Sequence, residues 1–134
     1  MKKIAIMLLL IISFLIVGCS SNIQPILQGT YQSDFDKDGY IVQFAIQTDD
    51  NSFVEYIDNR EVDRGTYEQK QANVYKLKSD KQNFEITLNN KNAFEIIINQ
   101  LNNGNPIQLI NIDDTPTYSS TDFDDVEAYK DLLN

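Results

Sequence analysis

The chain has 134 residues, with 11 Lys or Arg against 20 Asp or Glu, and a formal net charge of −9. This length is typical of a single domain, and the acidic balance disfavours nucleic acid and anionic headgroups as partners. The sequence contains no His and a single Cys, which excludes Ser-His-Asp and Cys-His catalysis, imidazole metal ligands and an internal disulfide.

The first 18 residues have the pattern of a secretion signal. Lys2 and Lys3 give a short positive start, and residues 4–17 are uncharged and almost wholly apolar, interrupted only by Ser13. The run is shorter than the roughly 20 residues of a spanning helix and fits the core of a signal peptide. We therefore expect residues 1–18 to form a signal-peptide helix outside the folded domain.

The signal ends in a four-residue box before the only cysteine, Cys19; the box consists of Leu15, Ile16, Val17 and Gly18. This segment resembles the lipobox of bacterial lipoproteins. The resemblance implies diacylglyceryl transfer to the Cys19 thiol and cleavage after Gly18. Cys19 would then carry fatty-acyl chains such as palmitate, and two or more chains anchor a protein stably where one does not. We therefore expect a lipid-anchored protein on the extracytoplasmic face of the cell membrane, with membrane lipid as a partner through Cys19.

Residues 19–28 are expected to be a lipidated tether that holds the domain close to the bilayer. The segment contains little apolar material, and Pro25 disfavours a helix. The domain is expected to begin at Gly29 and to include residues 29–134.

Short apolar–polar alternations separated by turn residues predict β-strands between Gly29 and Asp113. Phe84, Ile86 and Leu88 give the clearest alternation. Turn pairs such as Asp38-Gly39 and Asn103-Gly104 tolerate the positive φ of tight turns, and Asp58-Asn59 is a further turn candidate. Strands are predicted over residues 30–35, 40–46, 53–57, 62–68, 74–78, 84–88, 94–98 and 107–112. This pattern indicates an all-β domain, a small antiparallel meander of about eight strands closed as a barrel or stacked as a sandwich.

One short motif occurs twice, as Gly29-Thr30-Tyr31 and as Gly65-Thr66-Tyr67. The two copies would mark two halves of a barrel, each a small meander. Alternatively, Gly-Thr-Tyr is simply a favourable strand start, since Gly ends a turn and Thr and Tyr favour strands.

The end of the chain predicts a helix over residues 122–133. Thr121 is the expected N-cap, and the carboxylates of Asp residues in the first turn interact favourably with the positive N-terminal end of the helix dipole. Phe123, Val126, Tyr129 and Leu133 fall on one stripe, so the helix is expected to pack on the strands. A polar linker over residues 113–120 would precede it.

A meander opened by Gly29-Thr30-Tyr31 and followed by a helix is similar to lipocalin-like lipoproteins. The resemblance implies a barrel that holds a small apolar ligand in a cavity, lined by Phe44, Phe84 and Phe94. The chain departs from that family in its shorter length, in Tyr31 where lipocalins usually have Trp, and in having no Trp at all. The alternative to a ligand cavity is a small barrel whose interior is filled by its own side chains.

One segment reproduces the front half of a calcium loop, with side-chain oxygens at alternating positions: Asp34, Asp36 and Asp38. Gly39 permits the sharp turn, and Tyr40 would offer its carbonyl. The closing Glu of such loops is replaced by Ala45, so Glu55 or Asp50 would have to complete the shell. The alternative is an Asp-Gly hairpin with solvated carboxylates. No cofactor is expected beyond this weak Ca²⁺ site.

The sequence predicts a protein that is not an enzyme. The leading hypothesis is a non-catalytic binding or accessory module, of immunity or exclusion type, that contacts another envelope protein. A second hypothesis is a carrier of a small apolar ligand. A third is a pheromone peptide released from the signal, over residues 11–18. The abundance of Lys, Asn, Asp and Ile suits a low-GC Gram-positive bacterium.

Overall fold

The computed structural model describes residues 23–35 and 38–134. The predicted signal peptide, the lipobox and Cys19 lie outside the described residues, and so does the predicted calcium ligand Asp36. The other sequence predictions can be compared with the described part of the chain.

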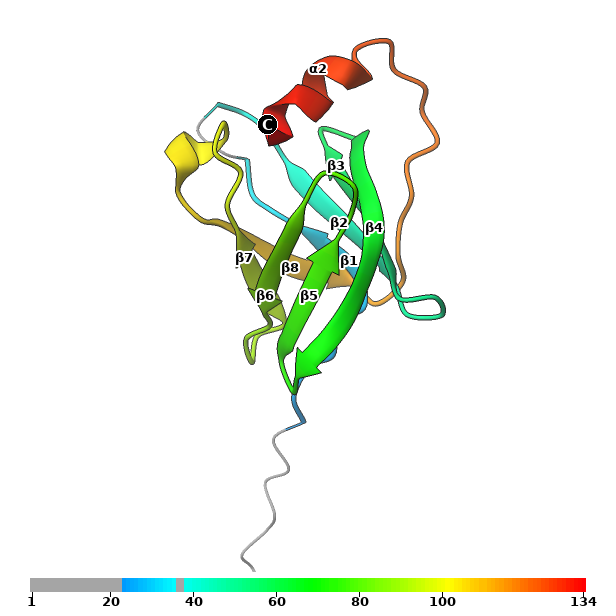
Figure 1. Cartoon of the computed structure of the whole chain (residues 1–134), viewed down its shortest axis with the longest axis vertical. Helices are drawn as coiled ribbons and strands as arrows, with labels where there is room; N and C mark the ends of the chain where they lie inside the picture. The colour runs from blue at the N-terminus through cyan, green and yellow to red at the C-terminus, as the bar shows by residue number, and fades with distance from the viewer. Residues whose placement is uncertain (1–22, 36–37) are drawn as a thin grey trace, which may run out of the picture.

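Eight antiparallel strands form one sheet that curls into a nearly closed barrel, so the predicted all-β class is confirmed (Figure 1). All eight predicted strands are present, with ends shifted by a few residues. They are β1 (Gly29–Gln32), β2 (Val42–Gln47), β3 (Ser52–Ile57), β4 (Arg60–Gln71), β5 (Val74–Lys78), β6 (Asn83–Thr87), β7 (Ala93–Ile96) and β8 (Ile107–Asp113).

The strand order is β6-β5-β4-β3-β2-β1-β8-β7. The first strand pairs with the last, β1 with β8, so the sheet wraps around its apolar face. The two edges of the sheet are β6 and β7, which are consecutive in the chain. The barrel is therefore complete except along one seam between these two strands.

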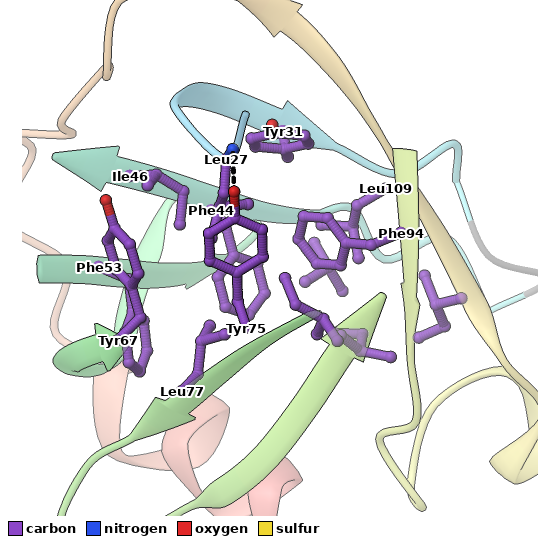
Figure 2. Packing of buried hydrophobic residues seen from close by; sticks show 14 of the residues in the cluster. Leu27, Tyr31, Phe44, Ile46, Phe53, Tyr67, Tyr75, Leu77, Phe94 and Leu109 are labelled. Carbon is purple, nitrogen blue, oxygen red and sulfur yellow. Dashed lines mark hydrogen bonds between the residues drawn. The ribbon is translucent and has the colours of Figure 1, made fainter. Parts of the chain in front are cut away.

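Aromatic rings from several strands fill the barrel (Figure 2). The centroid of the Phe44 ring lies 5.9 Å from that of Phe53 and 5.8 Å from that of Phe94, and Phe94 lies 5.0 Å from Tyr31. All four side chains are at most 1% exposed. The alternation of the strands places them on the inner face, and burying rings of this size stabilises the barrel strongly.

The folded domain begins before Gly29, because Leu27 is part of the core. Its side chain is 2% exposed, and its N–H donates to the Tyr75 hydroxyl at 3.2 Å (Figure 2). The predicted tether over residues 19–28 is therefore too long at its C-terminal end. At about 3.3 Å per residue, the part that remains between Cys19 and Leu27 spans at most roughly 25 Å.

The predicted polar linker after β8 is docked against the outside of the barrel. The Thr30 hydroxyl donates to the Thr115 carbonyl at 2.8 Å and accepts from the Thr117 N–H at 2.9 Å. The Ser119 N–H donates to the Tyr56 hydroxyl at 3.2 Å. The segment covers a second, outward-facing apolar cluster, which consists of Ala45, Val54 and Tyr56.

The repeated Gly-Thr-Tyr motif has a local cause in each copy. A Cβ at Gly29 would lie 2.1 Å from the Asp113 carbonyl oxygen, and a Cβ at Gly65 would lie 2.1 Å from that of Lys78. Each glycine thus permits close approach of a neighbouring strand. Gly29 opens β1, but Gly65 lies inside β4, so the strand-start explanation fits only the first copy. The neighbours also differ, since Gly29 meets the end of β8 and Gly65 meets β5.

The C-terminal helix is shorter than predicted. The helix α2 spans Val126–Lys130 and continues as the 3₁₀ turn η3, Asp131–Leu133. Its N-cap is Asp125, not Thr121, so residues 122–125 lie outside the helix. The predicted packing is present: Tyr129, Leu132 and Leu133 pack against the barrel core.

We expect Phe44→Ala to lower the free energy of unfolding by about 3–5 kcal/mol, because it removes a fully buried ring that contacts two others. Phe35 is 72% exposed, so Phe35→Ala is the matched control and should change stability by less than about 0.5 kcal/mol. Urea unfolding of both variants measures the difference. Equal effects would contradict the packed interior.

Candidate functional site

A concave surface lies along the seam between β6 and β7. The groove has a volume of about 510 Å³, within the roughly 300–1,000 Å³ of small-ligand sites. Its walls come from the two sheet edges and from the segments next to them. They consist of Gln82, Asn83, Phe84, Glu85, Glu95, Ile96, Ile97 and Pro106.

The turn that joins β6 to β7 is closed partly by a side chain. The Asn89 N–H donates to the Ala93 carbonyl at 2.9 Å. The return bond from the Ala93 N–H goes to the Asn89 side-chain Oδ1 at 3.1 Å, and the same oxygen accepts from the Lys91 N–H. The backbone carbonyl of Asn89 accepts instead from the Asn92 N–H at 3.1 Å. The two strands meet at this turn but do not continue as a paired ladder.

The pairing register identifies the backbone groups that face the groove. On β6, the Leu88 N–H bonds to the Asn73 carbonyl, so the even-numbered residues face β5. On β7, the Asn92 carbonyl accepts from the Asn111 N–H, so here too the even-numbered residues face the paired strand, β8. Backbone bonding directions alternate along an antiparallel strand. The backbone N–H and C=O groups that point away from the paired strands therefore belong to Asn83, Glu85 and Thr87 on β6, to Glu95 on β7, and to Ile97 directly after β7.

Two carboxylates are buried inside the barrel close to one end of this groove. Glu55 on β3 is fully buried, and its register partner Asp63 on β4 is 8% exposed. The register shifts here by one residue, so Val62 is an extra residue in β4, a bulge that lets neighbouring side chains share the interior. Glu55 lies between the core residues Phe53 and Ile57 on the same face of its strand.

Gln82 links the two carboxylates to the groove that it also lines. Its side-chain Nε2 donates to Glu55 Oε2 at 2.6 Å and to Asp63 Oδ2 at 2.8 Å. The Ser79 hydroxyl donates to the same Asp63 oxygen at 2.6 Å. Within the described part of the chain, Glu55 Oε1 has no hydrogen-bond partner. An unpaired buried oxygen of this kind is costly when the carboxylate is charged.

The pKa of Glu55 is raised to about 8, chiefly by burial and less by the nearby charge of Asp63, against the opposing hydrogen bond from Gln82. Glu55 is therefore mainly protonated at neutral pH. Because it is completely enclosed, a substrate could not reach it without opening the barrel. The cluster is a buried acid in a structural position, and its chemical capacity is to take up or release one proton.

The sequence held a signal for this cluster. In the predicted strand 53–57, Glu55 shares the apolar face with Phe53 and Ile57, a position where a charged residue is unusual. The sequence pattern indicates Glu55 only as an outside ligand for the calcium loop. The partnership with Asp63 and Gln82 depends on the pairing of β3 with β4 and on the turn after β5, so it could not be predicted from local pattern.

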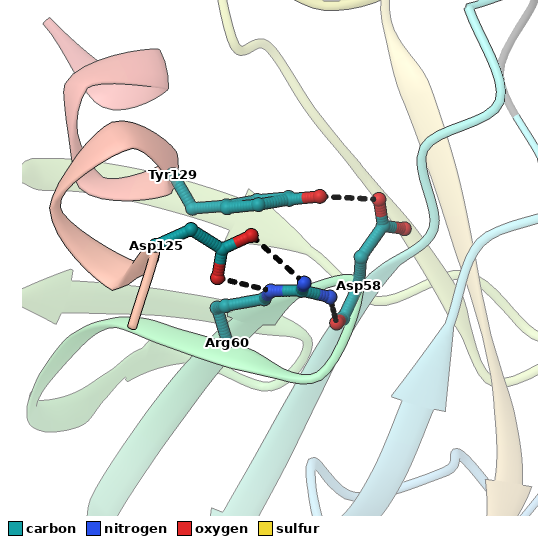
Figure 3. A network of polar contacts seen from close by, with 4 residues as sticks. All are labelled: Asp58, Arg60, Asp125 and Tyr129. Atoms are coloured by element: carbon teal, nitrogen blue, oxygen red, sulfur yellow. Dashed lines mark hydrogen bonds and ion pairs between the residues drawn. The ribbon is translucent and has the colours of Figure 1, made fainter. Parts of the chain in front are cut away.

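A second polar cluster fixes the C-terminal helix on the barrel (Figure 3). The Arg60 guanidinium makes a bidentate pair with Asp125, at 3.0 Å from Nε and 2.9 Å from Nη2, and donates to the Asp58 carbonyl. It also lies 3.9 Å from the ring centroid of Phe123 and 4.5 Å from that of Tyr129. The pair with Arg60 holds the pKa of Asp125 below its usual range.

The predicted calcium loop stays a prediction. Asp34 and Asp38 are exposed and Tyr40 is half-buried, while Asp36 lies outside the described residues. Among the described residues, no three acidic, His or Cys side chains are grouped as metal ligands. Glu55, one of the two carboxylates suggested to complete the shell, is held in the barrel by Gln82.

In comparisons with known proteins, no family model, no curated protein and no solved structure matches this chain. Among residues 23–35 and 38–134, no helix has the length and apolar character that a membrane crossing requires. Function can therefore be inferred only from the residues and their geometry.

Glu55→Gln is expected to change how stability depends on pH. A carboxyl whose pKa is raised by folding, here from 4.5 to about 8, binds more protons folded than unfolded. It therefore makes the free energy of unfolding fall by up to about 1.4 kcal/mol per pH unit between those values. Glu55→Gln mimics the neutral acid, so this fall should disappear and the variant should be the more stable form at pH 9.

Urea unfolding at intervals from pH 5 to pH 9 measures this effect. Glu85→Gln, the same change at an exposed strand position, is the matched control and should keep the slope of the wild type. A Glu55→Gln variant that retains the wild-type slope would contradict a protonated Glu55.

Arg60→Lys keeps the positive charge but loses the bidentate geometry and the stacking on two rings. We expect hydrogen exchange of the amides in residues 126–133 to become several-fold faster while the barrel strands are unaffected. The control is Arg64→Lys, whose partner Glu61 lies on the exposed surface. If both variants leave helix exchange unchanged, Arg60 does not hold the helix.

Proposed function

We propose that this chain is a lipid-anchored, extracytoplasmic binding module that acts without catalysis by contacting another protein of the cell envelope. The observation that carries the proposal is the close succession of a lipobox-like segment ending at Cys19 and a folded β-domain that starts at Leu27. A domain tethered so tightly samples only the space next to the bilayer, which is where an envelope partner would meet it.

The orientation of the domain supports a contact role. The described chain starts at the end of the barrel opposite the C-terminal helix α2 (Figure 1). An anchor attached there would leave α2, and the end of the seam groove at Gln82, pointing away from the bilayer. The acidic surface, which would become more acidic when Lys2 and Lys3 leave with the signal, favours a basic partner surface.

Several features disfavour catalysis in this proposal. The sequence supplies no His, and the proposed lipidation consumes its one thiol. The carboxyl with the strongly raised pKa, Glu55, is enclosed. A pair of carboxylates that hydrolyses a glycoside must face a cleft that admits the sugar, and Glu55 faces the packed interior.

The carrier of an apolar ligand is the weaker candidate because the expected cavity position is occupied. Phe44 and Phe94, two of the three rings that would have lined it, contact each other, while Phe84 is only partly buried, at the seam. The pheromone hypothesis concerns residues 11–18 and is independent of the domain.

The proposal predicts that Cys19→Ser abolishes incorporation of an alkyne-tagged fatty acid during growth and leaves the signal uncleaved after Gly18. The wild-type protein should carry the label and have an N-terminal mass that fits acylated Cys19. Ser20→Ala, next to the acceptor, is the control and should be labelled normally. An unlabelled wild-type protein would overturn the anchoring part of the proposal.

The binding part has a separate test. The lipidated protein, crosslinked in intact cells and purified from detergent-solubilised membranes, should retain a defined envelope protein. Retention should be lost when Cys19→Ser removes the anchor. Retention of a lipophilic small molecule with no protein partner would favour the carrier instead.

A further inference from the structure

We propose that the groove between β6 and β7 binds an extended, basic segment of a partner protein, which adds a strand at the seam of the barrel. The inference deepens the proposed function and rests on it. It starts from the one place in the described sheet where two strand edges face each other without being paired.

The backbone supplies the first requirement of strand addition. Asn83 and Glu85 on one side, and Glu95 and Ile97 on the other, line the groove and direct their N–H and C=O groups away from the paired strands. An open edge of this kind is a template for another strand. A peptide between two such edges would form hydrogen bonds on both sides, the main source of affinity in recognition by β-augmentation.

The side chains along the groove determine the pattern of apolar and charged residues in the strand that the partner would add, here called the guest strand. Phe84, half-buried, and Ile96, 6% exposed, lie on the inner side of the two edges. Glu85 and Glu95 are exposed on the outer side. Side chains of a strand alternate between faces, so every second guest residue would meet apolar surface and the residues between them would lie among carboxylates.

The charge of the groove selects a basic guest. Glu85 is paired with Lys76 on β5, whereas Glu95 is paired with the neutral Gln108 on β8. Glu95 therefore contributes charge that the neighbouring strand does not balance, and a Lys or Arg in the guest strand would lie between it and Glu85. Opposite charges on neighbouring strands stabilise the pair, and like charges destabilise it.

The same charges disfavour a second copy of this chain as the occupant. Pairing of the seam edge with the same edge of another copy would bring Glu85 or Glu95 of one chain close to these residues of the other. Inward or edge carboxylates are a recognised means of preventing edge-to-edge association. A partner of opposite charge is therefore the better match.

The test uses the lipidated protein in detergent and a capped octapeptide of alternating lysine and valine. We expect saturable binding that weakens at least tenfold between low salt and 0.5 M NaCl. Hydrogen exchange should slow at residues 83–87 and 95–97. A glutamate–valine octapeptide and a lysine–valine peptide with N-methylated backbone amides are the controls, and neither should bind. Binding of the N-methylated peptide, or protection elsewhere, would overturn strand addition.

Paired variants separate local charge from net charge. Glu85→Gln with Glu95→Gln should weaken lysine–valine binding at least tenfold. The control pair, Asp49→Asn with Glu68→Gln, removes the same amount of charge elsewhere, since Asp49 lies in the turn before β3 and Glu68 lies on β4. It should leave peptide binding within twofold of the wild type. Circular dichroism establishes that both pairs are folded. If both paired variants lost peptide binding equally, the effect would be one of net charge alone, and the groove would be overturned as the binding site.

The outcomes also separate this inference from the proposed function. If the envelope partner is retained equally by wild type and by the Glu85→Gln, Glu95→Gln variant, the groove inference fails while the binding function stands. If peptide binds at the seam but fatty-acid label is absent, the anchoring proposal fails while the groove inference stands. Dimerisation through the seam at micromolar concentration would overturn the basic partner in favour of a second copy.

Discussion

The structure depends on one constraint: the apolar face of a single eight-stranded sheet must be removed from water by the sheet itself. Pairing of β1 with β8 bends the sheet around Phe44, Phe94 and Tyr31. The two remaining edges are then forced together, because the short turn after Leu88 joins them. The edges meet at that turn, which the Asn89 side chain helps to close, and they are not paired beyond it. Curling thus produces both the packed core and the open seam.

The seam and the buried acid are connected consequences of this closure. Gln82, at the wide end of the seam, donates to both Glu55 and Asp63. One amide group thereby links the groove to the carboxylates in the interior. Burial keeps Glu55 protonated near neutral pH, which removes the cost of a charge in the core. The arrangement stores a pH-dependent component of stability in a protein that otherwise has few buried polar groups among its described residues.

The outer surface is organised by segments that the strand pattern alone would leave as loops. The segment after β8 lies across Tyr56 and Thr30, and Arg60 holds the short C-terminal helix through Asp125 and two aromatic rings. These contacts place the helix at the end of the barrel opposite the start of the described chain (Figure 1). In the proposed function, the side and far end of the barrel are the surfaces that a partner protein would meet.

Local sequence determined the class of the domain, the eight strands and most turns, because period-two alternation and residues such as Asp58 and Asn59, with φ of 48° and 67°, act over a few neighbours. It also supplied the lipobox-like segment, which stays a prediction. Only the tertiary structure decided that Leu27 belongs to the core, that the helix starts after Asp125, and that Glu55 meets Asp63 and Gln82. Each of these depends on strand order and on contacts between residues far apart in the chain. The seam has the same origin, since no local pattern states which two strands will be left without a partner.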